Sequence, residues 1–398
     1  MTVTKTFRYR CYPTKEQQVL LAKHFGSKRF VYNYFLNERK SLYLKNKETL
    51  NYYDNAKSLT ALKKDEQYEW LNEINSQTLQ SALRDLDTAY NRFFRKQARF
   101  PRFKAKRNQQ SFRVPQFVKY TDGELKIPKF KQTIKVNEDR PLTGKILFAT
   151  LVKKPSGKYF VSITVETEHI PYASSNKEVG VDLGIKDLAI CSDRTKHSNI
   201  KTTYKHKKKL TYNQRQLSKK TKGSNSKWKQ RVRVARVHER ISNIRHNHLH
   251  QISSNIVRDN QTICMESLGV VNMMKNHCLA KSIADASWGE LIRQIQYKSE
   301  WNERTFVQID RFFPSSKTCN KCKYIKDDLT LKDRKWVCPS CSIALDRDVN
   351  AAQNILEQGL KIHYSGLGTK SEYKQKREEA SSLEESVSHE TQGSLALG

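Results

Sequence analysis

The sequence predicts an α/β domain preceded by a helical part and a β-rich part. Apolar residues recur at helical spacing over residues 12–97, and short β-rich runs bounded by turns occupy residues 98–170. From residue 178 onward, apolar strands alternate with helices, which is typical of a sheet covered by helices. A length of 398 residues accommodates all three parts, since domains span roughly 100–200 residues each.

The helical part begins at a capping box. Thr14 and Gln17 follow Pro13, and a Thr followed three residues later by a Gln lets each side chain satisfy a backbone N–H at a helix start. Further along, Leu79, Leu83 and Leu86 follow one another at spacings of four and three. We therefore expect a helical domain over residues 12–97.

The β-rich part is expected to be a small sheet or a β-barrel. Residues 146–152 and 159–165 favour strands, and the Pro-Ser-Gly-Lys turn between them predicts a hairpin. A Thr-Asp-Gly turn at residues 121–123 predicts another reversal of the chain. Residues 1–11 alternate charged and aromatic side chains and are expected to add a strand, so that the helical domain is an insertion.

The α/β part carries three acidic residues in related places. Strands are expected at residues 179–183, 188–191, 263–265 and 306–309, and helices near 238–258 and 284–300. Asp182 and Glu266 each end an apolar strand, and Asp348 lies near the start of a later helix. Asp346 competes for the third place, but it suits the N-cap of that helix.

One such acid is usually solvated or a cap, but three of them suit a pair of Mg²⁺ ions, because carboxylates bind hard cations. Mn²⁺ is the alternative metal. Two ions about 4 Å apart can stabilise the attacking and leaving oxygens of phosphodiester hydrolysis.

Four of the eight cysteines form a cluster with metal-ligand spacing. Cys319 and Cys322 form one C-x-x-C knuckle, and Cys338 and Cys341 form a second one fifteen residues later. This spacing is typical of one tetrahedral Zn²⁺ site, which is structural because four thiolates leave no position for water. The other cysteines, at positions 11, 191, 264 and 278, are expected to be small apolar residues.

The net charge of +34 indicates a polyanionic partner. No stretch approaches the roughly 18 consecutive apolar residues of a membrane-spanning helix, and the N-terminus lacks the apolar region of a secretory signal. We therefore expect a cytoplasmic protein without membrane contact. Residues 366–398 are rich in Ser, Glu and Gly and are expected to be a disordered tail.

Two dense basic runs are expected to contact nucleic acid. Residues 92–113 hold nine basic residues, no acid and several phenylalanines, and residues 201–245 hold sixteen basic residues against one acid. Basic side chains neutralise phosphates and aromatic rings stack on bases, although a ring at helical spacing, such as Phe93, is more often part of a core. The expected contacts are Arg92, Arg95, Lys96, Arg99, Arg102, Lys104, Lys106, Arg107, Lys207, Lys208, Lys209, Lys219, Lys220, Arg231 and Arg233.

Taken in order, the motifs resemble TnpB, the transposon-encoded OrfB protein that is a compact relative of the type V CRISPR effectors. The resemblance rests on GVDLGIKDLAI, ICMESL and the two knuckles followed by DRDVNAAQNI, and it extends to YPTKEQ, FPRFKAKR and RISNIRHNHLHQISSNIV. It covers nearly the whole chain except the tail. Departures from the family pattern are Lys323 and Ser342, which stand where the family often has a glycine after each knuckle, and His246-Asn247-His248, which stands where an acidic residue is common.

The resemblance implies a fold class and a domain order. It implies an α/β RuvC nuclease domain of RNase H-like fold with an inserted zinc ribbon, a wedge β-barrel and an inserted helical recognition domain. The expected order is a wedge strand at 1–11, the recognition domain at 12–97, the wedge barrel at 98–170, RuvC at 171–313, the zinc insert for target nucleic acid at 314–345, the last RuvC helix at 346–365 and the tail at 366–398.

The resemblance also implies an activity, which is RNA-guided cleavage of DNA. Asp182, Glu266 and Asp348 match the family's nuclease acids and Mg²⁺ ligands, and the clustered cysteines match its zinc ligands. The implied partners are a guide RNA derived from the transposon end, a double-stranded DNA target beside a short transposon-adjacent motif, and a transposase of the same element acting in DNA recombination. Two alternatives stay open: a nuclease-independent RNA-guided DNA-binding regulator, and a transposase that joins strands itself.

Overall fold

The computed structural model describes residues 1–330 and 333–365. These residues form two compact units: residues 1–169 with 209–239 make up the first, and the remaining described residues make up the second. The predicted tail at 366–398 lies outside the described residues. Among the helices that the structure describes, none has the length and apolar character needed to cross a membrane.

The first unit contains one seven-stranded sheet. Its strands, in spatial order, are β2 (Gln110–Val114), β6 (Lys145–Lys153), β7 (Tyr159–Glu168), β1 (Thr2–Tyr12), β5 (Ile134–Asn137), β4 (Glu124–Lys126) and β3 (Lys119–Thr121). The N-terminal strand β1 pairs antiparallel with β7 along nearly its whole length and with β5 at its end. The predicted hairpin is confirmed, because β6 and β7 pair antiparallel around the turn at 155–158.

Helices inserted between β1 and β2 complete the first part of this unit. They are α1 (Lys15–Asn46), α2 (Tyr52–Leu62), the 3-10 helix η1 (Glu66–Glu73) and α3 (Ser76–Phe94). The predicted capping box is confirmed, since Thr14 and Gln17 exchange side-chain and backbone hydrogen bonds at the start of α1. Leu21 and Phe25 of α1 enter the core of the sheet, whereas Phe35 and the leucines of α3 form a separate helical core.

The second unit is built on a five-stranded sheet in the order β10-β9-β8-β11-β12. These strands are β8 (Glu178–Asp182), β9 (Asp187–Cys191), β10 (Lys196–Ser198), β11 (Thr262–Glu266) and β12 (Thr305–Ile309). The first three strands run antiparallel to one another, and β8, β11 and β12 run parallel. The strands expected from their apolar runs are therefore present.

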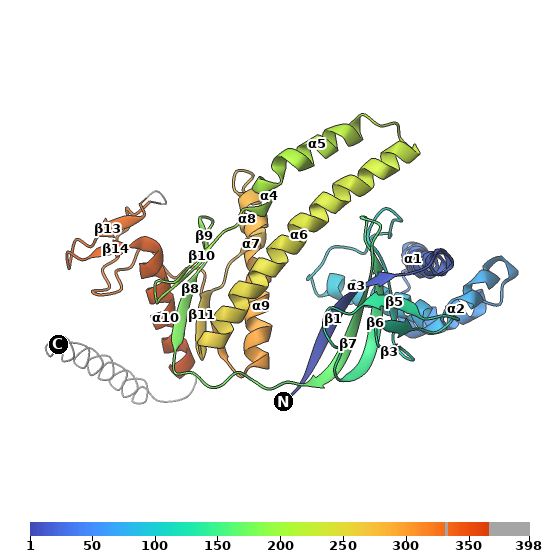
Figure 1. The fold of residues 1–398 in the computed structure, drawn as a ribbon, viewed down its shortest axis with the longest axis horizontal. Coiled ribbons are helices and arrows are strands. Elements are labelled where there is room, and N and C mark those ends of the chain that lie inside the picture. Colours follow the sequence, from blue (N-terminus) through green and yellow to red (C-terminus); the bar gives the residue numbers. More distant parts are fainter. Residues whose placement is uncertain (331–332, 366–398) are drawn as a thin grey trace. The chain divides into compact units, whose positions relative to one another are not determined.

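Helices cover both faces of this sheet (Figure 1). One face packs against Leu249, Ile252 and Ile256 of α6 (Asn225–Asp259) and against Leu291 and Ile295 of α9 (Trp288–Trp301). The opposite face packs against α10 (Arg347–Ser365) through Ile355 and Leu356. The remaining elements are α4 (Thr202–Lys205), α5 (Lys207–Ser218), α7 (Val270–Met273), α8 (Ala280–Ala286), β13 (Lys335–Val337) and β14 (Ala344–Asp346).

The observed helix boundaries differ from the predicted ones in two places. Helix α6 begins at Asn225, well before residue 238, because its polar first half is held to α5 by hydrogen bonds from the Gln230 amide to the carbonyl and side-chain oxygens of Asn213, at 3.0 and 3.1 Å. The helix expected near 284–300 is divided at Ser287, whose φ of 54° places it in the left-handed region and ends α8. Neither the early start of α6 nor the break at Ser287 changes the apolar periodicity of the sequence.

Candidate functional site

Two of the three predicted carboxylates lie at the same edge of the second sheet. Asp182 ends β8 and Glu266 ends β11, and these parallel neighbours are paired in register up to Val181 opposite Met265. The carboxyl ends of parallel strands are where open α/β sheets bind ligands. Both side chains are partly exposed there, so they are accessible to a ligand in solvent.

The third carboxylate reaches this edge from α10. Asp348 lies in the first turn of that helix, and Asp346 accepts hydrogen bonds from the backbone N–H groups of Asp348 and Val349 at 3.1 and 3.2 Å. Asp346 is therefore the N-cap residue, as expected. Close contact between α10 and β8 depends on Gly180, because a Cβ atom there would lie 2.0 Å from the Ala352 carbonyl oxygen.

The Asp182 carboxyl lies within electrostatic reach of the other two carboxylates. Burial, followed by the negative charges of Glu266 and Asp348, raises the pKa of Asp182 to about 7. Burial also raises the pKa of Glu266, whereas a hydrogen bond from the Ser315 hydroxyl opposes that shift. An Asp182 carboxyl whose ionisation is disfavoured by two nearby carboxylates suits a divalent cation, which would stabilise its charged form.

The carboxylates are near one another but do not converge on one point. Within residues 1–330 and 333–365, only the cysteine cluster brings three or more metal-binding side chains within 4.8 Å of one another. Asp348 makes two ion pairs, to Arg334 at 3.1 Å and to Arg347 at 3.0 Å. The sequence analysis identified neither arginine. Arg334 is fourteen residues from Asp348, and only the fold brings the two side chains together.

The four clustered cysteines come together as predicted. Their sulfur atoms all lie within 4.8 Å of one another, with Sγ–Sγ distances of 3.7 Å for Cys319 and Cys341 and 3.4 Å for Cys322 and Cys338. A tetrahedral zinc ion with Zn–S bonds of about 2.3 Å separates its sulfurs by about 3.8 Å, so the cluster fits that ion. A backbone hydrogen bond from Tyr324 is the main cause that lowers the pKa of Cys322 to about 6, whereas burial and the neighbouring thiols raise the pKa of Cys341 to about 12.

Each knuckle is a tight turn with the same hydrogen bonds. The N–H of Lys323 donates to the carbonyl of Cys319 at 3.0 Å, and the N–H of Ser342 donates to that of Cys338 at 2.8 Å. Both donors have left-handed backbone, with φ of 65° for Lys323 and 57° for Ser342. These are the two positions where the resembling family often has glycine, and the geometry supplies the reason, since glycine adopts this conformation without a Cβ penalty.

A network of buried amides connects the zinc insert to α10 and to Glu266. The Asn350 side chain donates to the carbonyl of Thr318 at 2.7 Å, and the Asn354 side chain donates to the carbonyls of Thr318 and Ser315 at 2.6 and 2.8 Å. Ser315 in turn donates to Glu266. The sequence signal for this network is a pair of asparagines four residues apart within an otherwise apolar helical pattern.

The predicted nucleic-acid contacts are mostly solvent-exposed. Thirteen of the fifteen basic side chains are exposed, and Lys104 and Lys220 are partly buried. Lys104 lies 3.7 Å above the Tyr32 ring and 3.8 Å from the Asp85 carboxylate, and burial lowers its pKa to about 8. Lys104 thus has a structural role in the first unit. Contact between the fifteen basic residues and phosphates stays a prediction.

Three of the four other cysteines are buried as expected. Burial raises the pKa of Cys11, Cys191 and Cys264 to about 12, so these thiols stay protonated and behave as apolar groups. Cys278, between α7 and α8, is exposed, so it is not packed in a core like the other three.

Family comparisons match most of the chain. The OrfB family of the IS605 type, described as a probable transposase, matches residues 162–277. A family described as the Cas12f1-like TNB domain matches residues 288–355, which include the cysteine cluster. A helix-turn-helix family of the same OrfB type matches residues 1–48, which fold here as β1 followed by the single long helix α1.

Individual relatives match nearly end to end. A protein of Streptomyces pristinaespiralis, named as a candidate RNA-guided DNA endonuclease, is 37% identical over 395 residues, 98% of each chain. InsQ of Escherichia coli K12, named in the same way, is 32% identical over 89% of this chain and 92% of its own. A cryo-EM structure of a Cas12f1-sgRNA-target DNA complex shares the fold, with a TM-score of 0.55 at 14% identity over 89% of this chain and 98% of that one.

Proposed function

This chain belongs to the OrfB family of IS605-type elements, the TnpB family, and on that basis we propose that it is an RNA-guided DNA endonuclease. One observation carries the proposal: Asp182, Glu266 and Asp348 gather at one sheet edge in a chain that matches a relative named for this activity over 98% of both lengths. An intact set of carboxylates favours an enzyme over a regulator that only binds DNA.

The three carboxylates would hold Mg²⁺, or Mn²⁺, in a RuvC-type nuclease domain of RNase H-like fold. When bound, such ions stabilise negative charge on the attacking and leaving oxygens of the cleaved phosphodiester. The chain's own contribution is to position the ligands. Ser315 orients the Glu266 carboxylate by its hydrogen bond, and Gly180 lets α10 approach β8 closely enough to bring Asp348 to Asp182.

The cysteine cluster would hold one structural zinc ion. Its surrounding core is small and consists of Leu329, Trp336 and Leu345 with the cysteines themselves. So few apolar side chains rarely stabilise a fold alone, and a metal is the usual supplement. The side-chain amides of Asn350 and Asn354 hydrogen-bond to this insert from α10. They would therefore fix the position of the insert relative to the carboxylates.

The partners proposed for this chain are a guide RNA and double-stranded target DNA. The solved Cas12f1 complex contains both kinds of nucleic acid, and the exposed basic residues of this chain provide counter-charge for them. In such effectors base pairing with the guide reads the target sequence, and the protein reads a short flanking motif. We further propose that the DNA target lies beside a transposon-adjacent motif and that a transposase of the same element is a partner. The cytoplasmic location and the domain order implied by the resemblance are part of the same proposal.

Plasmid cleavage tests the proposal. The protein is co-expressed with RNA from its own transposon end, purified with that RNA, and mixed with a plasmid carrying the matching target and Mg²⁺. We expect cleavage by the native chain and a loss of at least about 10³-fold for Asp182→Ala, Glu266→Ala and Asp348→Ala, since each removes a ligand of the reacting centre.

The matched control is Asp193→Ala, which removes an exposed acid beyond β9. It should cleave like the native chain. RNA content is measured for every variant, so that loss of chemistry is separated from loss of the guide. Equal cleavage by the native chain and Asp182→Ala would refute the nuclease function.

A further inference from the structure

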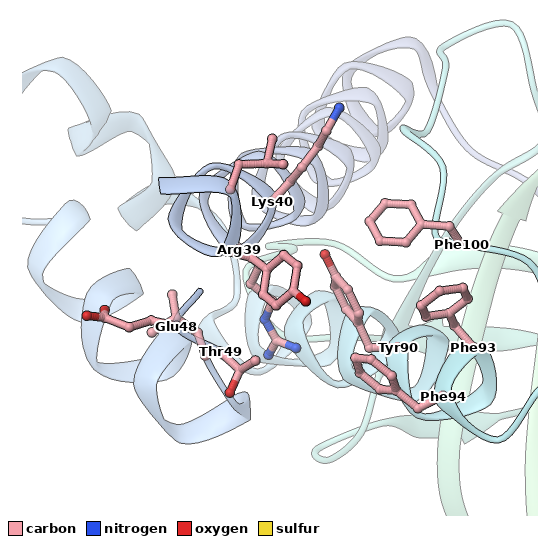
Figure 2. Close-up of a pocket in the computed structure, with 11 residues that line it drawn as sticks. Arg39, Lys40, Glu48, Thr49, Tyr90, Phe93, Phe94 and Phe100 are labelled. Carbon is pink, nitrogen blue, oxygen red and sulfur yellow. The ribbon is translucent and has the colours of Figure 1, made fainter. Parts of the chain in front are cut away.

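The helical part of the first unit contains an aromatic pocket that the proposed cleavage chemistry does not use. It lies between the end of α1, residues 48–50 and the end of α3, with a volume of about 440 Å³, and cavities of roughly 300–1,000 Å³ are typical of small-ligand sites. Figure 2 shows Tyr90, Phe93, Phe94 and Phe100 gathered on one side of it, with Glu48 and Thr49 on the other.

Two helix ends build the pocket. Helix α3 ends in a turn in which Lys96 is left-handed, with φ of 57°, and the N–H groups of Gln97 and Ala98 return to the Arg92 carbonyl at 2.9 and 3.2 Å. That turn sends the chain back so that Phe100 meets Tyr90 edge to face, with centroids 5.7 Å apart. Helix α1 ends at Lys47, which is also left-handed.

The aromatic surface of the pocket is available to a ligand. Phe94 is 65% exposed, Phe100 is 43% exposed and Tyr43, on the α1 side, is 51% exposed. Core residues of the same helix, such as Leu83 and Leu86, are fully buried by comparison. Exposed rings grouped around a cavity mark a binding surface more often than isolated ones do.

The floor of the pocket is a buried and fixed arginine. The Arg39 side chain is 6% exposed, donates to Asn55 at 2.5 Å and pairs with Asp87 at 3.3 Å. Its guanidinium lies 5.2 Å from the centre of the Tyr90 ring. Arg39 thus holds the Tyr90 ring of the pocket in place through a cation–π contact.

Basic residues are available to the phosphates of a bound nucleotide. Lys40 lines the pocket, and Arg92, Arg95 and Lys96, which flank the lining residues Phe93 and Phe94 in the sequence, are exposed. Glu48 and Thr49 add a carboxylate and a hydroxyl that can accept hydrogen bonds from a ribose hydroxyl, a group that DNA lacks.

We propose that this pocket binds a single unpaired nucleotide of the guide RNA, with its base stacked on the exposed face of Phe94 and bordered by Phe100, and with its phosphates toward the basic residues at the end of α3. The inference rests on the proposed function for the presence of a guide RNA. Recognition of RNA by splayed bases that stack on aromatic rings and arginine planes is the common mode for loops and bulges. The rings would thus anchor one nucleotide of the RNA scaffold. The residues that carry these rings are distant in the protein sequence from the three carboxylates.

The first test is photochemical. The complex that copurifies with RNA is irradiated with ultraviolet light, digested and examined by mass spectrometry. We expect a ribonucleotide adduct on the peptides that contain Tyr90 to Phe100, and at one RNA position. If the complex retains RNA but these peptides carry no adduct, or carry one to DNA, the pocket inference is overturned. If the native protein retains no RNA at all, the proposed function fails instead.

The second test uses substitutions at Phe94, which is exposed enough that truncation leaves the fold intact. Loss of one base-stacking ring weakens binding by about 5- to 150-fold, so Phe94→Ala and Phe94→Leu should lower RNA affinity by that factor. Phe94→Trp should retain it. The matched control is Phe117→Ala, which removes a 75% exposed ring outside the pocket and should bind like the native chain.

A thermal melt of each variant confirms that the fold is unchanged. Equal RNA affinity for Phe94→Leu and Phe94→Trp would overturn the stacking proposal, because leucine keeps the apolar surface but not the ring.

Discussion

At the scale of single residues, the turns of the two C-x-x-C knuckles depend on left-handed backbone at Lys323 and Ser342. A residue with a Cβ atom pays about 1–2 kcal/mol for this conformation, whereas glycine adopts it freely. Lys323 recovers part of that cost through its contacts with Asn320 and Glu357. The described structure gives Ser342 no comparable side-chain contact, so the strain there is less compensated.

Ser342→Gly is therefore expected to stabilise the zinc-loaded insert by about 0.5–1 kcal/mol. This value is the strain energy that glycine removes minus the conformational entropy that glycine costs on folding. The measurement is competition for zinc with a chromogenic chelator, in which the variant should hold zinc about two- to fivefold more tightly. Ser340→Gly is the comparison variant. It should hold zinc less tightly, because position 340 is not left-handed and the Ser340 side chain hydrogen-bonds to Cys322. Weaker zinc binding by Ser342→Gly would contradict this account.

A second residue-scale feature is the ion pair between Arg334 and Asp348. The guanidinium lies 3.1 Å from the carboxylate and is 51% exposed, so it competes with any cation for that ligand. Arg347 makes a second ion pair to the same carboxylate, but it is largely buried and also donates to the Thr330 carbonyl, so it is part of the local fold.

Arg334→Ala should lower the Mg²⁺ concentration needed for half-maximal cleavage. An exposed ion pair contributes about 0.2–1 kcal/mol, so the shift should be up to about fivefold. Cleavage rates measured across a Mg²⁺ titration test this, with Lys335→Ala as a control of equal charge whose ammonium is not an ion-pair partner of Asp348 in the described chain. An unchanged or higher Mg²⁺ requirement for Arg334→Ala would show that the pair does not compete.

At the scale of elements, the contact between β8 and α10 determines how Asp182 lies relative to Asp348. A Cβ at Gly180 would come within 2.0 Å of the Ala352 oxygen and 2.6 Å of the Leu356 nitrogen. Both are backbone atoms of α10, so the helix itself must shift to admit the methyl group. The second close approach is at Gly359, where a Cβ would lie 2.3 Å from the sulfur of Cys264.

Gly180→Ala should destabilise the second unit by about 1–3 kcal/mol or more, because overpacking forces backbone displacement. It should also reduce cleavage more than it reduces RNA binding, since it separates two of the three carboxylates. Gly289→Ala is the control: the added Cβ meets no atom within 4 Å, and alanine in a helix should gain about 0.4–1 kcal/mol. Chemical denaturation of both variants measures the difference, and equal stability would contradict the close contact.

The elements that the sequence predicted are those with strong apolar periodicity. Strands β8, β9, β11 and β12 are continuous apolar runs between turns, and their positions are confirmed within one residue or two. Strand β2 was missed because Phe112 and Val114, its buried residues, stand within a basic run. The polar start of α6 was missed because hydrogen bonds between Gln230 and Asn213 hold it, and such bonds leave no periodic signal.

At the scale of the whole molecule, the cysteine cluster and the strand-end positions of the acids were predictable, but the residues that contact them were not. The cysteine spacing and the acids at strand ends are local patterns, so they can be identified from the sequence alone. Ser315, Asn354 and Arg334 reach the site from positions far apart in the chain, and only the fold shows that they contact it. The net charge of +34 indicated nucleic acid without showing which residues stay free to bind it.

The central claim is that a bound RNA directs this chain to cut DNA, and exchange of the guide segment tests it most directly. The protein is purified with two RNAs that differ only in that segment and is mixed with one plasmid carrying both targets. We predict that each complex cuts only the target matching its own guide, and that Asp182→Ala cuts neither. Cleavage at the same place with both guides, or at neither target by the native complex, would contradict the claim.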